Sequence, residues 1–376
     1  MFRQLGILVA AGLAGPILAS FRSLRLPMVI GELAAGALIG NTGLHLIDPK
    51  ASAFPVFYSF GFAMLMLTAG THVDVRSPAI RRGAPRGLLA LAVVVAMAVP
   101  VGIGVAAAVG LGHQFLVVVL LAGSSAAVAF PTIEERGLTG ASVAYLTAWI
   151  ALADTVTVVL MPLGLTGGGH LISALVGDAA IIVVAALLMV AALRLRPRTR
   201  VREEIVDSRR KGWALQLRLS VLLLLVLAAI AEGTGASTLV AGFAAGMVLI
   251  HLGEPDRLAL QISGLANGFF VPIFFVLLGA ELDLRALVSD PRALTFALLM
   301  AAGATVVHVL AASVTSRQQR LSTGLAATAQ LGLPAAAAAL ALQSHALSPA
   351  LAAALVAAGC LTLLPATIGA TRLASD

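Results

Sequence analysis

One carboxylate stands in the middle of a run of residues that is otherwise apolar. Asp154 lies near the centre of the stretch 146–162, LTAWIALADTVTVVLMP. A charged carboxylate at the centre of a membrane helix costs about 2.5–3.5 kcal/mol on insertion scales, so such an acid is expected to be functional. A carboxylate is a hard oxygen ligand for a monovalent metal cation or a proton, and the two compete for it. Asp154 is therefore predicted to bind one or the other. The alternative is a structural acid that accepts hydrogen bonds from backbone N–H groups.

Hydroxyl groups are placed where they could extend this site. Thr147 lies seven residues before Asp154 and Thr157 lies three after it, so all three share one face of a helix. Ser124 and Ser125, in an earlier apolar run, could supply hydroxyl or carbonyl oxygens to the same ion. The alternative for the serines is hydrogen bonding within their own helix, and for Thr157 it is packing between helices.

Four further polar side chains fall in apolar stretches. His308 could pair with Asp154 or relay protons, because imidazole titrates near neutral pH, or it could be an interhelical hydrogen-bond donor. Gln330 likewise could support the site or could be an interhelical hydrogen-bond donor. Glu32 could support coupling, or it could reach water from the cytoplasmic end of its helix. Asp178 is expected at the outer membrane interface.

The composition is that of a polytopic membrane protein. Of the 376 residues, 60% are hydrophobic and 11% are charged, and the mean hydropathy is +1.03, whereas a soluble domain needs a more polar surface. The single cysteine, Cys360, excludes an internal disulfide. The chain has no phosphate-binding GxxxxGK motif followed by Ser or Thr, and its two lysines, Lys50 and Lys211, lie in predicted loops. We expect no enzymatic activity, no cofactor and no nucleic-acid binding.

The apolar runs are long enough for repeated membrane crossings, since a spanning helix needs about 17–25 apolar residues. They predict thirteen spans, at about 4–20, 27–47, 54–72, 87–110, 114–132, 139–163, 170–193, 214–231, 235–251, 259–282, 291–315, 320–342 and 348–370. This count places twenty of the 24 basic residues on one side of the membrane and four on the other. Because basic loops favour the cytoplasm, we predict a multi-pass cell-membrane protein with its N-terminus outside and its C-terminus in the cytoplasm.

Three short motifs recur 209 or 210 residues further along the chain. They are VIGELAAGALI (29–39) with LVAGFAAGMVL (239–249), GTHVDVR (70–76) with GAELDLR (279–285), and GSSAA (123–127) with GLPAA (332–336). This offset contains seven predicted helices, an odd number, so the second copy enters the membrane in the opposite orientation.

The repeat predicts an all-α polytopic membrane protein built as a single transmembrane domain, 1–376. Two inverted six-helix repeats, 1–165 and 214–372, are joined by a linker helix and cytoplasmic loop at 166–213, and no soluble regulatory domain follows. In secondary transporters of this architecture, the substrate site lies near the midplane of the membrane, between the repeats.

Residues that interrupt helices occur at matching places in the two repeats. Gly123, Ser124 and Ser125 fall near the centre of one span, and Gly332 and Pro334 fall near the centre of its counterpart. Proline breaks a helix, and freed backbone groups at membrane depth are tolerated inside the protein or beside a cavity. Paired interruptions therefore predict two unwound, crossing helices at a transport site. The alternative is that Gly and Ser allow close helix packing.

Five stretches resemble, in order, those of the second subfamily of the monovalent cation:proton antiporter superfamily. They are LRLPMVIGELAAGALIGNTGL, LMLTAGTHVDVR, AGSSAAVAFPTIEERG, FFVPIFFVLLGAELDL and AQLGLPAAA, which together cover nearly the whole chain. The resemblance implies a proton-coupled exchanger in the lipid bilayer and a homodimer, with a core domain that moves against a dimerisation domain. It also implies that Asp154, in the helix after the first crossing helix, is the ion-binding carboxylate.

The chain departs from this family pattern at three positions. Sodium-type members often have two adjacent acids, where this chain has Ala153 before Asp154. Leu333 stands where many members have Glu, and His308 is the ionisable residue in a helix where many have Lys. The resemblance as a whole implies exchange of Na+ or K+ for protons by alternating access, and these departures leave two alternatives open. A sodium-coupled organic-anion symporter of the same fold, or a membrane sensor that does not transport, are the alternatives.

Overall fold

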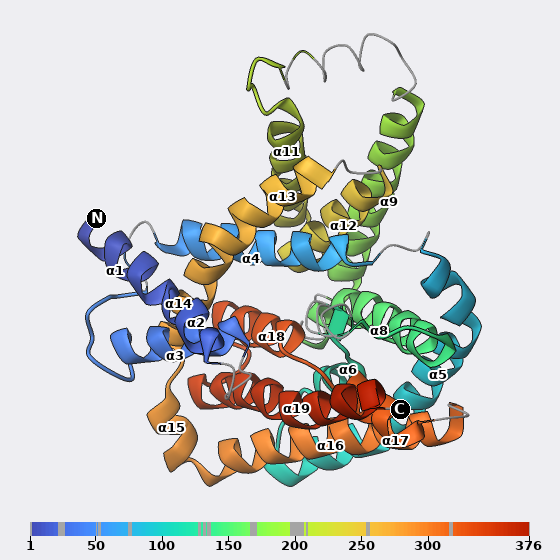
Figure 1. The fold of residues 1–376 in the computed structure, drawn as a ribbon. Coiled ribbons are helices and arrows are strands. Elements are labelled where there is room, and N and C mark those ends of the chain that lie inside the picture. The colour runs from blue at the N-terminus through green and yellow to red at the C-terminus, as the bar shows by residue number, and fades with distance from the viewer. Residues whose placement is uncertain are drawn as a thin grey trace. The chain divides into compact units, whose positions relative to one another are not determined.

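The computed structural model describes residues 2–21, 27–49, 51, 54–73, 77–126, 129, 130, 133, 137–165, 171–195, 207, 210–252, 256–315 and 319–375. These residues form helices, turns and bends without any strand, which confirms the predicted all-α fold (Figure 1). The helices are α1 (Phe2–Gly12), α2 (Ala14–Ser20), α3 (Met28–Ile39), α4 (Phe54–Thr71), α5 (Pro78–Val109), α6 (Gln114–Ala122), α8 (Ala141–Leu160), α9 (Leu171–Leu195), α11 (Leu215–Thr234), α12 (Thr238–His251), α13 (Asp256–Leu265), α14 (Val271–Glu281), α15 (Leu284–Ser289), α16 (Pro291–Thr315), α17 (Arg320–Ala327), α18 (Gly332–Gln343) and α19 (Pro349–Ser375). A short 3₁₀ helix, Pro162–Gly164, follows α8, and a π-helical turn, Ala266–Phe270, joins α13 to α14.

Ten helical segments within this described part of the chain are long and apolar enough to cross a membrane. Two shorter apolar helices, α3 and α12, occupy the predicted spans 27–47 and 235–251, and α6 occupies the first part of 114–132. Each of the thirteen predicted spans therefore contains a helix.

The described residues form two compact units, and each draws on both predicted repeats. The first unit is built from 1–55, 75–165 and 275–376, and the second from 56–74 and 166–274. In the first unit, α5 packs along α8 and α16, and α19 packs against α16, α17 and α18. In the second unit, α9, α11 and α12 pack against one another.

Glycines allow α3 and the end of α14 to touch within the first unit. A Cβ atom added to Gly36 would lie 2.1 Å from the carbonyl oxygen of Val276, and one added to Gly279 would lie 2.2 Å from that of Leu33. Both distances are far shorter than a carbon–oxygen contact permits. Only glycine therefore allows the two backbones to approach so closely.

The same contact recurs within the second unit, between α12 and α4. A Cβ on Gly246 would lie 2.1 Å from the carbonyl oxygen of Leu67, and one on Gly70 would lie 2.2 Å from that of Phe243. These four residues are the repeat counterparts of the four in the α3–α14 contact, at offsets of 209 or 210. The internal repeat is thus visible in backbone geometry as well as in sequence, and in each contact a helix of one repeat pairs with a helix of the other.

Candidate ion-binding site

The first crossing helix is interrupted where the sequence predicts. Helix α6 ends at Ala122, and the chain from Gly123 to Ser125 is not helical before helical structure resumes at Ala126. Gly123 has extended backbone angles (φ −69°, ψ 156°), which turn the chain out of the helix. Ser124 and Ser125 are buried, so the polar groups freed at this break lie inside the protein.

The second break lies a few residues earlier than predicted. Helix α17 ends at Ala327 and α18 begins at Gly332, so the non-helical residues are 328–331, rather than Gly332 and Pro334. Pro334 is the third residue of α18, where a backbone N–H has no partner within the helix. The missing N–H of proline therefore costs nothing there, and Pro334 marks the start of a helix instead of a break.

The two breaks are hydrogen-bonded to each other. The backbone N–H of Ser125 donates to the carbonyl oxygen of Ala329 over 2.8 Å, and the Ser124 hydroxyl donates to the carbonyl oxygen of Ala327 over 2.6 Å. The side-chain amide of Gln330 donates to the carbonyl oxygen of Gly123. The Ser124 hydroxyl thus binds the opposite crossing helix and not its own, and Gln330 is a hydrogen-bond donor between the crossing helices.

Asp154 reaches the first break from α8. Its side chain is buried, and its Oδ2 accepts a hydrogen bond of 3.1 Å from the backbone N–H of Ala126, the residue at which helical structure resumes. The N-terminal end of a helical segment carries partial positive charge, which favours a carboxylate at this position. Among the residues that the structure describes, no Lys, Arg or His side chain forms an ion pair with Asp154.

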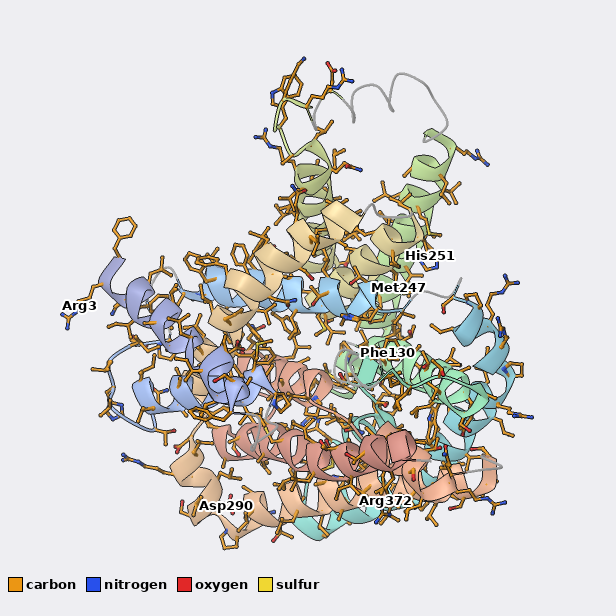
Figure 2. The ribbon with its side chains drawn as sticks, in the orientation of Figure 1. Arg3, Phe130, Met247, His251, Asp290 and Arg372 are labelled. Atoms are coloured by element: carbon orange, nitrogen blue, oxygen red, sulfur yellow. The ribbon has the colours of Figure 1, made fainter. Side chains whose placement is uncertain are left out.

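Three other charged side chains of the first unit lie at helix ends. Arg3 is in the first turn of α1, Asp290 immediately precedes α16, and Arg372 is in the last turn of α19 (Figure 2). Arg3 and Arg372 are exposed, whereas Asp154 lies in the interior of a 20-residue helix and is 5% exposed. The position of Asp154 is therefore not that of an ordinary helix-end charge.

The threonines on α8 differ in what they contact. The Thr157 hydroxyl donates to the Ala153 carbonyl oxygen over 2.7 Å, and its oxygen lies 3.6 Å from where a Cβ on Gly123 would be. Thr157 thus combines a bond within its own helix with a position beside the first break. Thr147 is only half-buried. Thr155 bonds back to Ala151 over 2.8 Å and contributes to its own helix.

His308 lies beside the first break and is fully buried. Its Nδ1 donates to the Ala304 carbonyl oxygen over 2.8 Å, and its ring stacks on that of Trp149 with 5.6 Å between centroids. The backbone of Gly123 lies near this ring. The buried Nε2 has no hydrogen-bond partner among the described residues. Because Nδ1 carries the proton, Nε2 of a neutral ring is an acceptor.

Two acids that were expected to reach water or the interface are buried elsewhere. Glu32 is 4% exposed and lies where α3 meets α2, since a Cβ on Gly15 would come within 2.8 Å of its Oε1. In the second unit, Asp178 is 4% exposed, and its Oδ1 accepts from the backbone N–H of Ser237 over 3.4 Å, at the start of α12. Close glycine-mediated packing explains both burials, because Gly15 and Gly177 admit a neighbouring segment at van der Waals distance. No described hydrogen bond connects either acid to the breaks.

Sequence reasoning missed Thr362, on α19. Its hydroxyl lies 3.1 Å from both the backbone nitrogen and the carbonyl oxygen of Gln330, in the second break. A signal was present in the sequence. Thr362 follows Asp154 by 208 residues, close to the repeat offset, so it falls at nearly the same place in the corresponding helix of the second repeat.

A cavity of about 100 Å³ adjoins the second break, between segments of the first unit. Its lining is apolar except for Thr367, and includes Leu146, Ala329, Leu363 and Ala366. An apolar lining offers no ligands for a cation and favours a dry cavity.

The candidate ligand atoms closest to Asp154 on its own helix and in the first break are oxygen atoms. The Asp154 carboxylate, the Thr157 hydroxyl and the freed backbone carbonyls suit a hard cation or a proton, not a soft transition metal. Within the part of the chain that is described, no three His, Cys, Asp or Glu residues cluster as transition-metal ligands would.

Known proteins resemble this chain in sequence. The family model described as "Sodium/hydrogen exchanger, transmembrane" matches residues 8–374. The chain is 26% identical over 375 residues to the putative Na(+)/H(+) antiporter YjbQ of Bacillus subtilis, an alignment that covers 93% of this chain and 59% of that protein. It is 28% identical over 302 residues to the glutathione-regulated potassium-efflux system protein KefC of Cronobacter sakazakii, covering 77% of this chain and 47% of that protein.

A solved structure has a similar fold. The sodium proton antiporter MjNhaP1 of Methanocaldococcus jannaschii superimposes with a TM-score of 0.68 at 18% identity, covering 100% of this chain and 98% of that one. The family match extends over almost the whole chain, and the paired helix breaks and the intramembrane carboxylate lie within the matched residues. The chain belongs to the transmembrane sodium/hydrogen exchanger family.

Proposed function

We propose that this chain exchanges a monovalent cation, Na+ or K+, for protons across the membrane by alternating access. The observation that carries the proposal is Asp154: a buried carboxylate, held at a helix break by the Ala126 N–H and paired with no basic side chain among the described residues. A buried carboxylate without a counter-charge needs a cation or a proton, because an uncompensated charge in a protein interior is costly.

Competition for this carboxylate couples the two fluxes. When a cation occupies the site, the Asp154 oxygens are its ligands, and when a proton binds, the cation loses its only charged ligand and leaves. In either case the loaded site carries the same net charge. The change of access is proposed to occur only when the site holds a cation or a proton, because moving the empty carboxylate means moving an uncompensated charge. Neither ion would then leak across the membrane alone.

Thr157 and the freed carbonyls at the first break are proposed to complete the ligand set, with Ser125 beside them. A Cβ on Gly332 would lie 3.9 Å from the Ser125 hydroxyl oxygen, so this hydroxyl faces the second crossing helix. Ser124 is a less direct candidate, because its hydroxyl is donated to Ala327. Four other residues are proposed to support the site without binding the ion. They are His308, Gln330, Thr147 and Glu32.

The choice between Na+ and K+ is left to experiment, because relatives are named for each. YjbQ is named as a putative Na(+)/H(+) antiporter and KefC as part of a potassium-efflux system. The chain spans 59% of the length of the first and 47% of the second, so activities of those whole proteins are only candidates for this one. The proposal includes a cytoplasmic C-terminus, from the distribution of basic residues, and a homodimer.

The test is proton flux in everted membrane vesicles loaded with a pH-sensitive dye. After respiration has acidified the vesicles, addition of Na+ or K+ should release protons, with Li+ as a third cation, and vesicles without the protein should not respond. Release with one cation at low concentration identifies the substrate. No release with any of the three would contradict the proposal and favour a membrane sensor that keeps the fold. Sodium-dependent uptake of an organic anion without cation-dependent proton release would favour the symporter.

A further inference from the structure

The second break leaves the backbone of Gln330 without helical partners, and a single hydroxyl on α19 serves both of its polar groups. Thr362 Oγ1 accepts from the Gln330 N–H over 3.1 Å and lies 3.1 Å from the Gln330 carbonyl oxygen. The hydroxyl proton is shared between that carbonyl and the Gly359 carbonyl at 2.7 Å. Thr362 is 2% exposed, so water does not replace these bonds.

The helix that carries Thr362 is shaped to receive the break. A Cβ on Gly359, one turn before Thr362, would lie 3.0 Å from the Gln330 carbonyl oxygen and 3.2 Å from the Pro334 ring. Glycine at 359 thus lets α19 approach both the break and the first turn of α18. Thr362 and Gly359 together hold the non-helical segment against a regular helix.

Gln330 connects the second break, which Thr362 holds, to the first break. Its side-chain amide donates to the Gly123 carbonyl oxygen, in the segment that ends at Ala126. The N–H of Ala126 in turn donates to Asp154. A continuous series of buried contacts therefore runs from α19 through both breaks to the carboxylate.

The two repeats use equivalent helices in this way. In the first repeat, α8 follows the crossing helix and Asp154 accepts a backbone N–H from the break over 3.1 Å. In the second repeat, α19 follows the crossing helix and Thr362 accepts a backbone N–H from its break over 3.1 Å. The oxygen is charged in one repeat and neutral in the other. Thr362 therefore supplies the same backbone contact without adding a second titrating group.

We propose that Thr362 is a positioning residue for the cation site, which it affects through Gln330 and the first break. This inference rests on the proposed exchange function. It predicts that the Thr362 hydroxyl controls how well the site binds the cation, although Thr362 does not touch the ion.

The test compares Thr362→Val with Thr362→Ser in the vesicle flux assay. Valine keeps the shape but removes the hydroxyl, so we expect the half-saturating cation concentration to rise about tenfold, as for the loss of one buried hydrogen-bond partner. Serine keeps the hydroxyl and should restore a value within about twofold of the unmodified protein. The matched control is Thr367→Val, also on α19, whose hydroxyl bonds only within its own helix, to Leu363 over 2.8 Å. It should leave the cation dependence unchanged.

A wild-type cation dependence in Thr362→Val, or a serine variant as impaired as the valine variant, would overturn the proposal. Hydrogen–deuterium exchange provides an arm that does not depend on transport. Thr362→Val should speed amide exchange in peptides that cover Thr328–Leu331 and also in those that cover Gly123–Ala126. Faster exchange in the second break alone would show that the anchoring does not reach the site. If the unmodified protein transports no cation, the proposed function has failed, and the exchange data still decide whether Thr362 holds the first break.

Discussion

The backbone N–H of Ala126 donates to Asp154 Oδ2 over 3.1 Å, and this bond connects the carboxylate on α8 to the interrupted crossing helix. An intramembrane acid is expensive unless its charge is compensated. Here the bond supplies partial compensation and holds the carboxylate beside the first break. The consequences of this geometry can be tested one substitution at a time.

Removing the charge of Asp154 should abolish exchange without unfolding the protein. In Asp154→Asn the side-chain oxygen can still accept from Ala126, so we expect expression and melting temperature close to those of the unmodified protein. Cation-dependent proton release should fall to the level of vesicles without the protein. Asp154→Ala, which leaves the buried Ala126 N–H without an acceptor, should also lose about 1–3 kcal/mol of stability. Normal proton release by the Asn variant would place the coupling site elsewhere, with Glu32 as the next acid to examine.

Competition between proton and cation predicts a defined pH dependence. If both bind Asp154, raising the proton concentration must raise the cation concentration needed for half-maximal exchange. In the pH range where protons occupy most sites, the increase should approach tenfold for each unit by which pH falls, because one proton competes with one cation. The measurement is the half-saturating cation concentration at several pH values, with equal pH on both sides at the start. A value that is independent of pH would mean that proton and cation occupy separate groups.

The glycine contacts predict a pair of stability effects. Gly36→Ala in α3 and Gly246→Ala in α12 would each place a Cβ 2.1 Å from a carbonyl oxygen, so we expect each to lower stability by about 1–3 kcal/mol, as overpacking does. Gly104→Ala in α5 is the control, because nothing lies within 4 Å of the added Cβ and alanine favours a helix. Melting temperatures of the purified proteins measure these changes in stability. Equal melting temperatures for Gly36→Ala and Gly104→Ala would show that α3 and α14 are not in close contact.

The sequence predicted the geometry of the candidate site where the signal is local, and it was wrong where the geometry depends on packing. Asp154 in an apolar run and Gly123–Ser125 in a span are conspicuous, and the structure brings them together as expected. The second break was misplaced because proline both ends helices and begins them, and the residue type does not say which.

Tertiary contacts account for the remaining differences. Thr362 is one of many threonines until α19 is placed against Gln330, and most of the others bond only within their own helix. Glu32 and Asp178 were expected at or near water because each lies toward the end of its span. Their burial depends on which helices pack against them, through Gly15 and Gly177, and one sequence does not reveal that.

The surroundings of His308 predict that exchange is electroneutral. The ring is fully buried, its Nδ1 proton is held by the Ala304 carbonyl, and no acid among the described residues forms an ion pair with it. A positive charge on the ring would therefore be buried without compensation, so we expect His308 to stay neutral throughout the cycle. With Ala153 in place of a second acid, Asp154 is then the one group among the described residues at the first break that we expect to change its charge, so we expect one proton to move for each monovalent cation.

This prediction is tested in proteoliposomes with a membrane potential set by potassium and valinomycin, using Na+ or Li+ as the transported cation. Moving one charge through 100 mV is worth about 2.3 kcal/mol, so an electrogenic cycle would respond strongly to the potential. We expect equal exchange rates at potentials of either sign, and His308→Gln, which keeps a side chain that can donate to Ala304, should retain that insensitivity. A clear dependence on potential that disappears in His308→Gln would instead identify His308 as a second coupling group. Two protons would then move per cation, because the ring would gain and lose its charge in each cycle.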